Sequence, residues 1–508
     1  MNKLINLDQL KQKIKKFKLN KKKIILCHGV FDLLHAGHIT HFQESKKLGD
    51  ILVVSVTPDK YVSKGPNRPI MKLKQRMQII AQVECVDYVV ENFTADASSI
   101  ISALKPDIYS KGFDYKNHRD DLTGKILQEK KSINKVGGKI HYTQSKLFSS
   151  SKIINDLSIN LNEAQRQYLK LTKSKLNKFK VPFEKYIDNF KKLKVLIIGE
   201  AIIDQYVFCE ALGKSGKEPM LVMKNLDTQK YLGGTLAIAK NIASFCKNIS
   251  ILTYLGSKKS EIKFMQNNLP KNVQLNYIIK KNSPSILKTR YIDHINSTKL
   301  FGVYSISNNL ISKKNELSLL NKLKKNIKKF DLVIVSDYGH GLITDKIRSY
   351  IMKKSKFLSV NAQLNAANIG FHTISKYKLS DLLIINENEL RHEMRDNKSN
   401  LDELMFNLIK KVKTKHLVVT SGKDGSKILN TANKNIINCP AFTFEAKDKI
   451  GAGDTFLSLL SLCVKMDMPP ELSMLISSLG AAENVKNLAN SKYTSNIEMK
   501  KFLKSYLK

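Results

Sequence analysis

Residues 21–38 read KKKIILCHGVFDLLHAGH: a lysine-rich start, a short apolar run and a turn with two histidines. An apolar run without alternation is typical of a strand that is buried on both faces of a parallel sheet. The turn at residues 29–38 opens a helix, so His35 and His38, three residues apart, share one helical face. Backbone N–H groups at a helix start favour an anion. The stretch therefore predicts a phosphate-handling strand, turn and helix.

The pattern that begins here repeats along the chain. Helical and apolar strand-like segments alternate up to about residue 150, and a second lysine-rich start with an apolar run, KKLKVLIIGE at residues 191–200, opens another series that continues to the C-terminal end. Alternation of this kind indicates repeated βαβ units. We therefore predict an α/β protein with two doubly wound domains, residues 1–158 and 191–508. Residues 159–190, polar and lysine-rich, are interpreted as a linker helix.

Composition limits the classes of function. The chain has 508 residues, of which 42% are hydrophobic and 26% charged, which is enough for two or three ordinary cores. The net charge is +42, yet only eight of the 86 basic residues are Arg and the lysines are spread over the whole length. A nucleic-acid footprint would cluster or carry Arg, so we expect a general lysine bias and no nucleic-acid partner.

Location follows from what the sequence lacks. We find no apolar run long enough to span a membrane, no apolar signal segment at the start, and six cysteines without metal-ligand spacing. We expect a cytoplasmic protein with reduced thiols and no membrane partner.

Two histidines at a helix start can be an ordinary polar cap, but the string at residues 29–38 also resembles the H-x-G-H turn of cytidylyltransferase-like nucleotidyltransferases. Over residues 21–155 the resemblance continues in a K-G-x-x-R-P loop at residues 64–69, a K-G-F-D-Y segment at residues 111–115 with Phe113 in place of the family's second Gly, and a serine turn at residues 149–151. It implies an N-terminal Rossmann-like nucleotidyltransferase domain in which His35 and His38 stabilise the reacting phosphates. The implied nucleotide-binding residues, with Lys46, Lys64 and Arg76 as cationic clamps, are Gly29, Phe31, Asp32, Gly37, Lys46, Lys64, Arg76, Lys111, Asp114, Ser149, Ser150 and Ser151.

A second site is predicted where residues 448–456, DKIGAGDTF, precede an apolar helix. The glycines at 451 and 453 let successive N–H groups point into one concavity, which makes an anion hole at a helix start. Asp454 at its mouth is placed to accept a proton from a substrate hydroxyl. A lone G-A-G-D string could equally be a glycine turn with an aspartate cap.

Five further pieces occur in order before this string, at residues 199–204, 233–241, 336–341, 386–389 and 420–425. With them, residues 193–508 resemble the ribokinase-like (PfkB) carbohydrate kinases. The resemblance implies Asp454 as catalytic base and Glu389 as the organiser of Mg²⁺. Asn361-Ala362-Gln363 departs from the acidic string of many relatives, and residues 485–488 lack the usual small-residue turn. The implied sugar-binding residues are Asp204, Gly233, Gly234, Asn241 and Asp337, and the implied nucleotide-binding residues are Asn386, Thr420, Gly422, Gly425, Gly451, Ala452 and Gly453.

The two resemblances together describe a two-step route to a nucleotide-activated sugar. They resemble the bifunctional heptose 7-phosphate kinases and heptose 1-phosphate adenylyltransferases that supply ADP-heptose for lipopolysaccharide, with the two domains in reversed order. This implies ATP and Mg²⁺, phosphorylation at O1, and sugar phosphates and nucleotides as partners; a homodimer is left open. Three alternatives remain. The first is an enzyme of the same architecture that uses CTP, or another sugar or polyol phosphate, to make capsule or glycolipid precursors. The others are a single-activity enzyme whose second domain is a sensor, and a nucleic-acid-binding protein.

Overall fold

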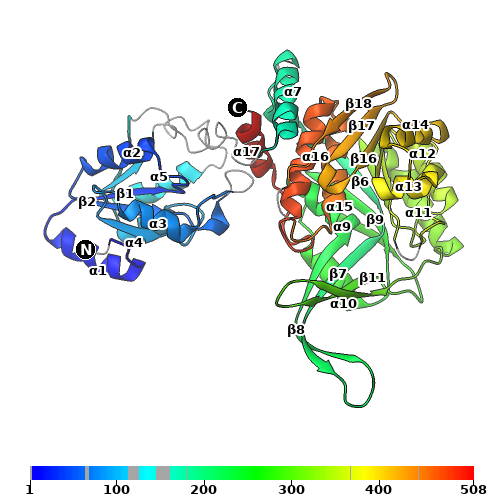
Figure 1. Cartoon of the computed structure of the whole chain (residues 1–508), viewed down its shortest axis with the longest axis horizontal. Coiled ribbons are helices and arrows are strands. Elements are labelled where there is room, and N and C mark those ends of the chain that lie inside the picture. The colour runs from blue at the N-terminus through cyan, green and yellow to red at the C-terminus, as the bar shows by residue number, and fades with distance from the viewer. Residues whose placement is uncertain are drawn as a thin grey trace. The chain divides into compact units, whose positions relative to one another are not determined.

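The computed structural model describes residues 3–62, 68–112, 125–144, 161–179, 181–365, 368–443 and 446–507. The chain divides into two compact units, residues 1–161 with 500–508, and residues 162–499. Each unit is built on a doubly wound, mainly parallel sheet with helices on both faces, which confirms the predicted fold class (Figure 1). None of the helices in the described ranges is long and apolar enough to cross a membrane.

The first unit has a five-stranded parallel sheet in the order β3-β2-β1-β4-β5. Alternate residues of its first strand face two separate cores, with Ile24 and Leu26 in one and Ile25 and Cys27 in the other. The winding direction reverses between β1 and β4, which is where ligands bind in open sheets of this kind. The strands are β1 (Ile24–Gly29), β2 (Ile51–Val56), β3 (Tyr88–Glu91), β4 (Ile108–Lys111) and β5 (Lys139–Tyr142). The helices are α1 (Leu7–Leu19), α2 (Ala36–Lys46), α3 (Leu73–Ala81), α4 (Ser98–Leu104) and α5 (Lys125–Lys135).

The second unit has a nine-stranded sheet in the order β10-β9-β6-β13-β14-β15-β16-β17-β18, parallel from β10 to β16 and antiparallel at the last two pairings. The strands are β6 (Lys194–Gly199), β9 (Asn248–Leu255), β10 (Val273–Ile279), β13 (Leu332–Asp337), β14 (Leu358–Ala362), β15 (Leu382–Asn386), β16 (His416–Thr420), β17 (Ser426–Asn430) and β18 (Asn435–Cys439). The helices are α7 (Glu163–Phe179), α8 (Phe183–Asn189), α9 (Thr235–Ala243), α10 (Lys259–Asn268), α11 (Lys313–Asn326), α12 (Asp345–Lys354), α13 (Glu387–Met394), α14 (Leu401–Lys411), α15 (Ala452–Lys465) and α16 (Pro470–Asn484), and α17 (Asn496–Leu507) runs from this unit into the first.

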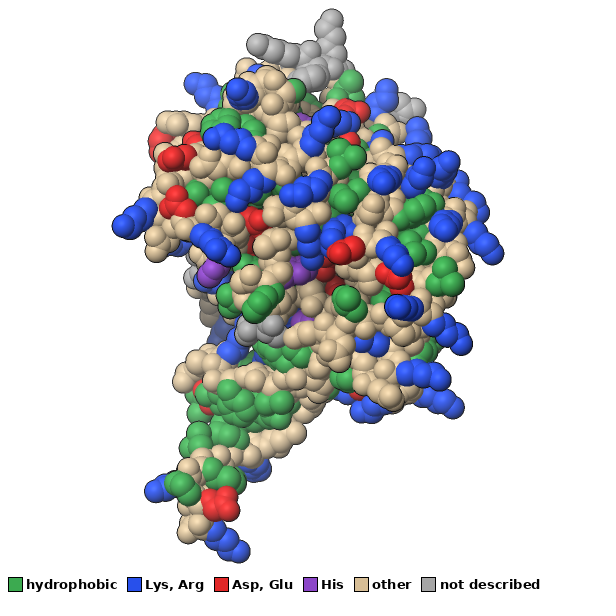
Figure 2. Space-filling model, turned by 90° about the vertical axis from the view of Figure 1, so that its right-hand side faces the viewer, with side chains coloured by type: hydrophobic (Ala, Val, Ile, Leu, Met, Phe, Trp, Pro, Cys, Tyr) green, Lys and Arg blue, Asp and Glu red, His purple; other side chains and the backbone are tan. Residues whose placement is uncertain are grey.

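A second sheet of this unit, which we call the lid sheet, was not predicted. It has four strands in the order β12-β11-β7-β8: β7 (Ala201–Lys214), β8 (Leu221–Gly234), β11 (Ile286–Asp293) and β12 (Lys299–Ser305). The long β7–β8 hairpin projects away from the body of the unit (Figures 1 and 2). The lid sheet matters because several polar side chains of the candidate site come from it.

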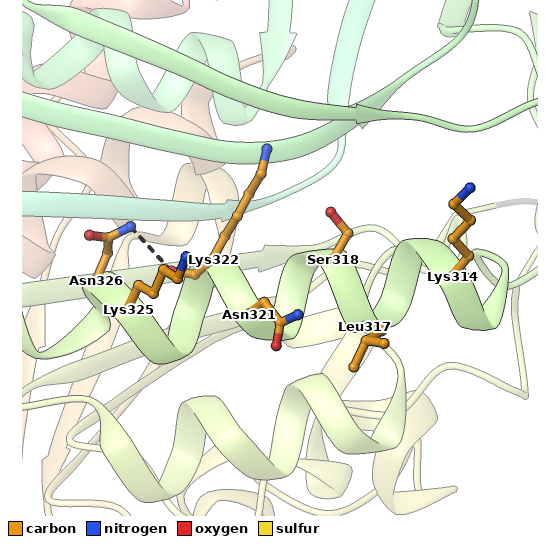
Figure 3. A pocket seen from close by; sticks show the side chains of 7 residues that line it. All are labelled: Lys314, Leu317, Ser318, Asn321, Lys322, Lys325 and Asn326. Carbon is orange, nitrogen blue, oxygen red and sulfur yellow. Dashed lines mark hydrogen bonds between the residues drawn. The ribbon is translucent and has the colours of Figure 1, made fainter.

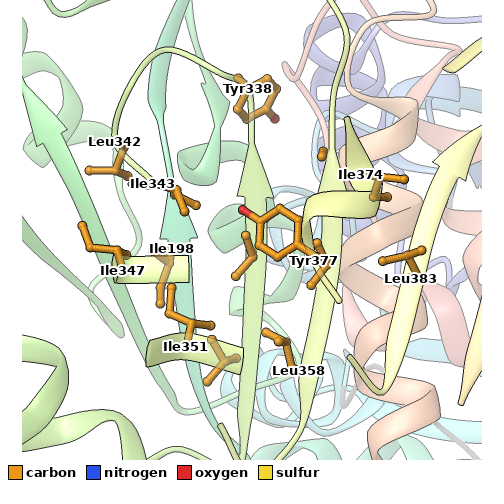
Figure 4. Close-up of a cluster of buried hydrophobic side chains, with 14 of the residues drawn as sticks. Ile198, Tyr338, Leu342, Ile343, Ile347, Ile351, Leu358, Ile374, Tyr377 and Leu383 are labelled. Atoms are coloured by element: carbon orange, nitrogen blue, oxygen red, sulfur yellow. The ribbon is translucent and has the colours of Figure 1, made fainter. Parts of the chain in front are cut away.

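The main core of the second unit lies between the nine-stranded sheet and the helices on one face. Ile198 of β6 lies next to Ile347 and Ile351 of α12, and Leu358 and Leu383 of neighbouring strands belong to the same cluster (Figure 4). On the opposite face α15 is buried from residue 454 to residue 464, as expected for a helix that is apolar all round. This burial fixes the start of α15, and with it the predicted anion hole.

The segment interpreted as a linker contains α7, which packs within the second unit. The Tyr168 hydroxyl donates to the Glu471 carbonyl oxygen at 2.8 Å, and the Gln165 amide donates to the Ala441 carbonyl oxygen at 2.6 Å. The domain bounds at residues 158 and 191 stay a prediction, which expression of the separate pieces would test. All six cysteines are free.

Candidate active sites

The anion hole predicted in the second unit lies at the start of α15. Gly451 caps the helix with φ +86°, and a Cβ there would sit 1.9 Å from the Asn490 side-chain oxygen, so this position requires glycine. Ala452, Gly453 and Asp454 form the first turn, where N–H groups have no partner within the helix. The geometry therefore leaves backbone donors and a carboxylate together at one helix end.

Asp454 is held by a neighbour that the sequence analysis did not single out. The Tyr338 hydroxyl donates to Asp454 Oδ1 at 2.7 Å. Burial raises the pKa of Asp454 to about 7, with Asp204 adding to the rise and Tyr338 and Lys288 opposing it. A carboxyl group with a pKa near neutrality is suited to take a proton from a hydroxyl.

The loop after β13 is held in place by hydrogen bonds to the Glu200 side chain. This fully buried carboxylate accepts hydrogen bonds from the backbone N–H groups of Tyr338 at 3.0 Å, His340 at 3.1 Å and Leu342 at 3.3 Å. Burial, together with Asp337, raises the pKa of Glu200 to about 7. Glu200 thus positions Tyr338, and through it Asp454.

Asp337, predicted to bind substrate, is instead occupied by internal partners. Its carboxylate accepts from the Gly339 N–H at 3.1 Å and the Tyr377 hydroxyl at 2.7 Å, and Lys376 Nζ lies 2.9 Å from Oδ2. Burial acts to raise its pKa, but Lys376 and His372 outweigh burial and hold the pKa of Asp337 below its usual value. We therefore assign Asp337 to shaping the loop and not to direct contact with the sugar.

Most of the residues predicted to bind sugar lie on the lid sheet. Asp204 of β7 is buried and pairs with Arg290 of β11 at 2.6 Å. Gly233 of β8 lies against it: a Cβ there would sit 2.2 Å from Asp204 Oδ2, and one at Gly234 would sit 2.5 Å from the Glu200 carbonyl oxygen. Asn241, on α9, is also buried. The structure brings Asp204 close enough to Asp454 to influence its pKa.

Gly233→Ala should displace the Asp204 carboxylate and weaken sugar binding. We expect the KM for the sugar to rise about tenfold, equivalent to about 1.4 kcal/mol, with little change in the KM for ATP. Steady-state kinetics with each substrate varied measures it. Gly216→Ala in the β7–β8 hairpin is the matched control, because a Cβ there meets nothing within 4 Å; equal kinetics of the two variants would contradict the assignment.

The residues predicted to hold Mg²⁺ and nucleotide lie at the ends of β15 and β16. Asn386 caps α13 by accepting from the Glu389 N–H at 2.8 Å, and the Glu389 carboxylate accepts from the N–H groups of Asn386 and Leu364, each at 3.0 Å. Burial raises the pKa of Glu389 to about 7. In the described ranges, no group of three His, Cys, Asp or Glu side chains could hold a metal. A single carboxylate still fits Mg²⁺, which is held mainly by waters and substrate phosphates.

The nucleotide turn predicted after β16 has the backbone that its glycines suggested. Gly422 and Gly425 adopt φ +57° and +94°, and a Cβ at Gly425 would sit 2.2 Å from the Cys439 carbonyl oxygen. Thr420 ends β16 directly before this turn. A cavity of about 430 Å³ opens beside Glu389 and is lined in part by Ala362 and Ile385.

A second hollow, of about 410 Å³, lies on the surface along α11 (Figure 3). It is lined by one helix face that carries lysine and asparagine side chains and no acid: Lys314, Leu317, Ser318, Asn321, Lys322, Lys325 and Asn326. Lys322 is already engaged with the Tyr277 carbonyl oxygen at 3.2 Å. We assign this hollow no chemistry.

The first unit places both predicted histidines at the start of α2. His35 is the N-cap, and its Nδ1 accepts from the Gly37 N–H at 3.1 Å. The His35 and His38 rings stack with centroids 3.9 Å apart, and Phe31 meets His38 edge-on at 5.3 Å. A Cβ at Gly29 would touch the Phe31 ring. The two imidazoles thus lie side by side at the carboxyl end of β1, next to the point where the sheet reverses.

Asp32 and Arg76, predicted to bind nucleotide, are buried and hold the surrounding loops. Asp32 accepts from the N–H groups of Ile70 at 3.0 Å and Met71 at 3.1 Å. Arg76 donates to the carbonyl oxygens of Val30, Met71 and Thr57, the last two at 2.9 Å each, and to Asp59 at 2.6 Å. Their contacts in the structure are those of positioning residues.

Two predicted cations are not gathered around the histidines. Lys46 ends α2, about 16 Å along the helix from His35, and pairs with Asp87 at 2.5 Å. The structure therefore does not bring Lys46 to the two histidines, and its role as a phosphate clamp stays a prediction. Lys111 ends β4 at the same edge as the histidines but is buried and paired with Glu129 at 3.0 Å. The remaining predicted residues lie outside the described residues: Lys64, Asp114, Ser149, Ser150 and Ser151.

Arg76→Met should destabilise the first unit by about 3 kcal/mol or more, because it leaves buried carbonyl oxygens without donors. Urea unfolding, combined with hydrogen exchange at the β1 and α3 amides, measures the loss. Lys74→Met, an exposed change on the same helix, should have little effect. Equal exchange protection in the two variants would contradict a positioning role for Arg76.

An anion hole with a carboxylate in one unit, and paired imidazoles at a helix start in the other, define a phosphate-transferring enzyme. Residues 192–488 match the model of the pfkB family carbohydrate kinases, and the chain belongs to that family. Residues 26–156 match the cytidylyltransferase-like family.

Two curated relatives are similar to parts of this chain. Bifunctional protein HldE of Campylobacter jejuni (strain RM1221) is 29% identical over 277 residues, which are 54% of this chain and 57% of that protein. Bifunctional protein HldE of Desulfatibacillum aliphaticivorans is 40% identical over 158 residues, 30% of this chain and 31% of that protein. In each case the match spans less than two thirds of the relative's length.

A solved structure is similar in fold. Phosphofructokinase-2 from Escherichia coli, in complex with potassium, superimposes with a TM-score of 0.50 at 13% identity, covering 62% of this chain and 100% of that one. This likeness concerns the fold of the kinase unit alone.

Proposed function

We propose that the chain is a bifunctional enzyme that makes a nucleotide-activated sugar, ADP-heptose. The observation that carries the proposal is Asp454, a buried carboxyl at the first turn of α15, held by Tyr338 beside the glycine anion hole. The stacked pair His35 and His38 at the start of α2 supports a second phosphate chemistry in the same chain. Similarity to proteins named Bifunctional protein HldE supports the pairing of the two reactions.

In the kinase reaction, the acceptor is heptose 7-phosphate and the donor is ATP. Asp454 takes the proton from the O1 hydroxyl, the bond from O1 to the γ-phosphorus forms, and the bond from that phosphorus to ADP breaks. N–H groups of residues 451–453 stabilise the charge on the transferring group. Asp204 and Asn241 hold sugar hydroxyls, and Glu389 would hold Mg²⁺, which neutralises phosphate charge when bound.

In the transferase reaction, a phosphate oxygen of the sugar 1-phosphate attacks the α-phosphorus of ATP and pyrophosphate leaves. His35 and His38 stabilise charge on the α-phosphate and the leaving group. The first product carries phosphates at both ends, whereas ADP-heptose has none at O7. A phosphatase must therefore act between the two reactions.

We also propose ATP rather than CTP as the nucleotide of the first unit, small molecules and no nucleic acid as partners, and a cytoplasmic location.

A scattered surface charge agrees with small-molecule partners. On the face shown in Figure 2, lysine and arginine side chains are interspersed with acidic and apolar ones. A duplex-binding protein would instead show salt-sensitive affinity for nucleic acid, which a filter-binding titration against salt would detect.

The proposal is tested on the full chain in two separate reactions. Heptose 7-phosphate with ATP and Mg²⁺ should yield the 1,7-bisphosphate, and heptose 1-phosphate with each nucleoside triphosphate should yield a nucleotide sugar and pyrophosphate, fastest with ATP. Mass spectrometry resolves the products. Absence of phosphoryl transfer to any sugar phosphate, or of pyrophosphate release from every triphosphate, would refute the corresponding half.

A further inference from the structure

Lys288 is a cation on the sugar side of the kinase site. It lies on β11 in register with Asp204 of β7 and Tyr304 of β12, so all three side chains lie on the same face of the lid sheet. Its ammonium lies 5.5 Å from the centre of the Tyr338 ring and 5.8 Å from that of Tyr304. Burial lowers the pKa of Lys288, while Asp204 and Asp454 act against that fall. Lys288 therefore lies near both Asp204, the carboxylate predicted to bind sugar, and Asp454, the proposed base.

The carboxylates that act on Lys288 are already engaged. Asp204 pairs with Arg290 at 2.6 Å, and Asp454 accepts from Tyr338 at 2.7 Å. Across the part of the chain that the structure describes, the Lys288 ammonium has no ion pair within 4.0 Å and no hydrogen bond. Lys288 is half-buried and its carboxylate neighbours are engaged elsewhere, so its position favours a ligand that supplies an anion within contact distance.

His340 adds an independent sign of a ligand. Its side chain is 1% exposed, and its Nδ1 lies 2.8 Å from the Asn308 side-chain oxygen, to which it donates. Its Nε2 is then an acceptor, and it has no hydrogen-bond partner among the described residues. Lys288 is the first of the charges that act on this ring. A buried acceptor of this kind calls for a hydroxyl donor.

We propose that Lys288 binds the phosphate that the acceptor sugar already carries, and that His340 accepts a hydrogen bond from a hydroxyl of the same molecule. The inference rests on the proposed kinase function and deepens it, since it selects a polyhydroxylated phosphate monoester over a free sugar. The transferring phosphoryl group has its own donors at residues 451–453. The site thus has two anion-binding places with different roles.

Lys288→Met in the full chain is the test, with heptose 7-phosphate and unphosphorylated heptose as acceptors. The KM for heptose 7-phosphate should rise about 50-fold, as expected for loss of a charge-assisted phosphate contact, with kcat nearly unchanged. The KM for ATP should not change. With unphosphorylated heptose the KM should stay near wild type, and turnover should fall only as far as the loss of the Lys288 charge raises the pKa of Asp454. Lys288→Arg should stay close to wild type. Lys230→Met is the matched control, because Lys230 is exposed and pairs with Gln205, on the opposite face of the lid sheet.

Each outcome is decisive. An unchanged KM for heptose 7-phosphate in Lys288→Met overturns the inference while wild-type turnover preserves the proposed function. An equal rise in KM for both acceptors also overturns it, because Lys288 would then not distinguish a sugar phosphate from a free sugar. Wild-type turnover of free sugars without turnover of any sugar phosphate refutes the proposed substrate and the inference together. If Lys288→Met unfolds early in a thermal melt, Lys288→Gln repeats the comparison, and unchanged KM in that variant has the same meaning.

Discussion

Asp454→Asn should reduce phosphoryl transfer about 1,000-fold while leaving the second unit folded. Asparagine keeps the shape of the side chain and can still accept from the Tyr338 hydroxyl, but it cannot take a proton from the sugar. The substitution also removes a buried charge, so the thermal stability should not fall. Release of ADP at saturating sugar phosphate measures the rate, and near-normal turnover of this variant would contradict the assignment.

The pH profile gives a second readout of the same carboxyl. Because burial raises the pKa of Asp454 to about 7, and a base acts only when deprotonated, wild-type kcat/KM should fall about tenfold per pH unit below that value. Tyr338→Phe removes a hydrogen bond that lowers this pKa, so its profile should shift to higher pH and recover on the alkaline side. A profile that does not move in Tyr338→Phe would show that another group controls the rate.

His35→Ala and His38→Ala should each reduce nucleotidyl transfer about 100-fold or more and leave phosphoryl transfer unchanged. The stacked rings of His35 and His38 are the side chains at the start of α2 that can stabilise charge on the α-phosphate. Alanine at either position removes one of these two rings. Pyrophosphate release with heptose 1-phosphate and ATP measures the loss.

The control for the histidines is His141→Ala, because His141 is exposed on β5. It should keep wild-type transferase activity. His35→Ala has a structural side effect, the loss of the cap on the Gly37 N–H, so hydrogen exchange at α2 separates that effect from catalysis. Normal pyrophosphate release in His38→Ala, with α2 intact, would contradict the proposed site.

Much of the fold could be predicted from the sequence, because buried parallel strands are apolar on both faces. The runs near residues 24–29 and 194–199 opened the two sheets as expected. The lid sheet could not be predicted in this way, because many of its strand residues are not buried. Most residues of β8, and all of β12, are half-buried or exposed. The sequence therefore has no continuous apolar run that would predict these strands, and their pairing depends on tertiary contacts.

The candidate sites were predicted unevenly. Glycines and the residues beside them were found because backbone geometry at Gly451 and Gly233 depends on local sequence. Lys46 lies away from the histidines because it ends α2, a distance along the helix that residue type alone does not indicate. Lys288 and His340 gave no signal in the sequence, since both depend on strand register and on a loop shaped by Glu200.

The central claim, that one chain holds two independent phosphate-transferring sites, is tested most directly by mixing variants. Heptose 7-phosphate, ATP, Mg²⁺ and a phosphatase for the distal phosphate are incubated with Asp454→Asn, with His38→Ala, or with both, and ADP-heptose is measured by mass spectrometry. We predict almost no product from either variant alone and restored product from the mixture. ADP-heptose formed at the wild-type rate by either variant alone, or no product from the mixture, would contradict the claim.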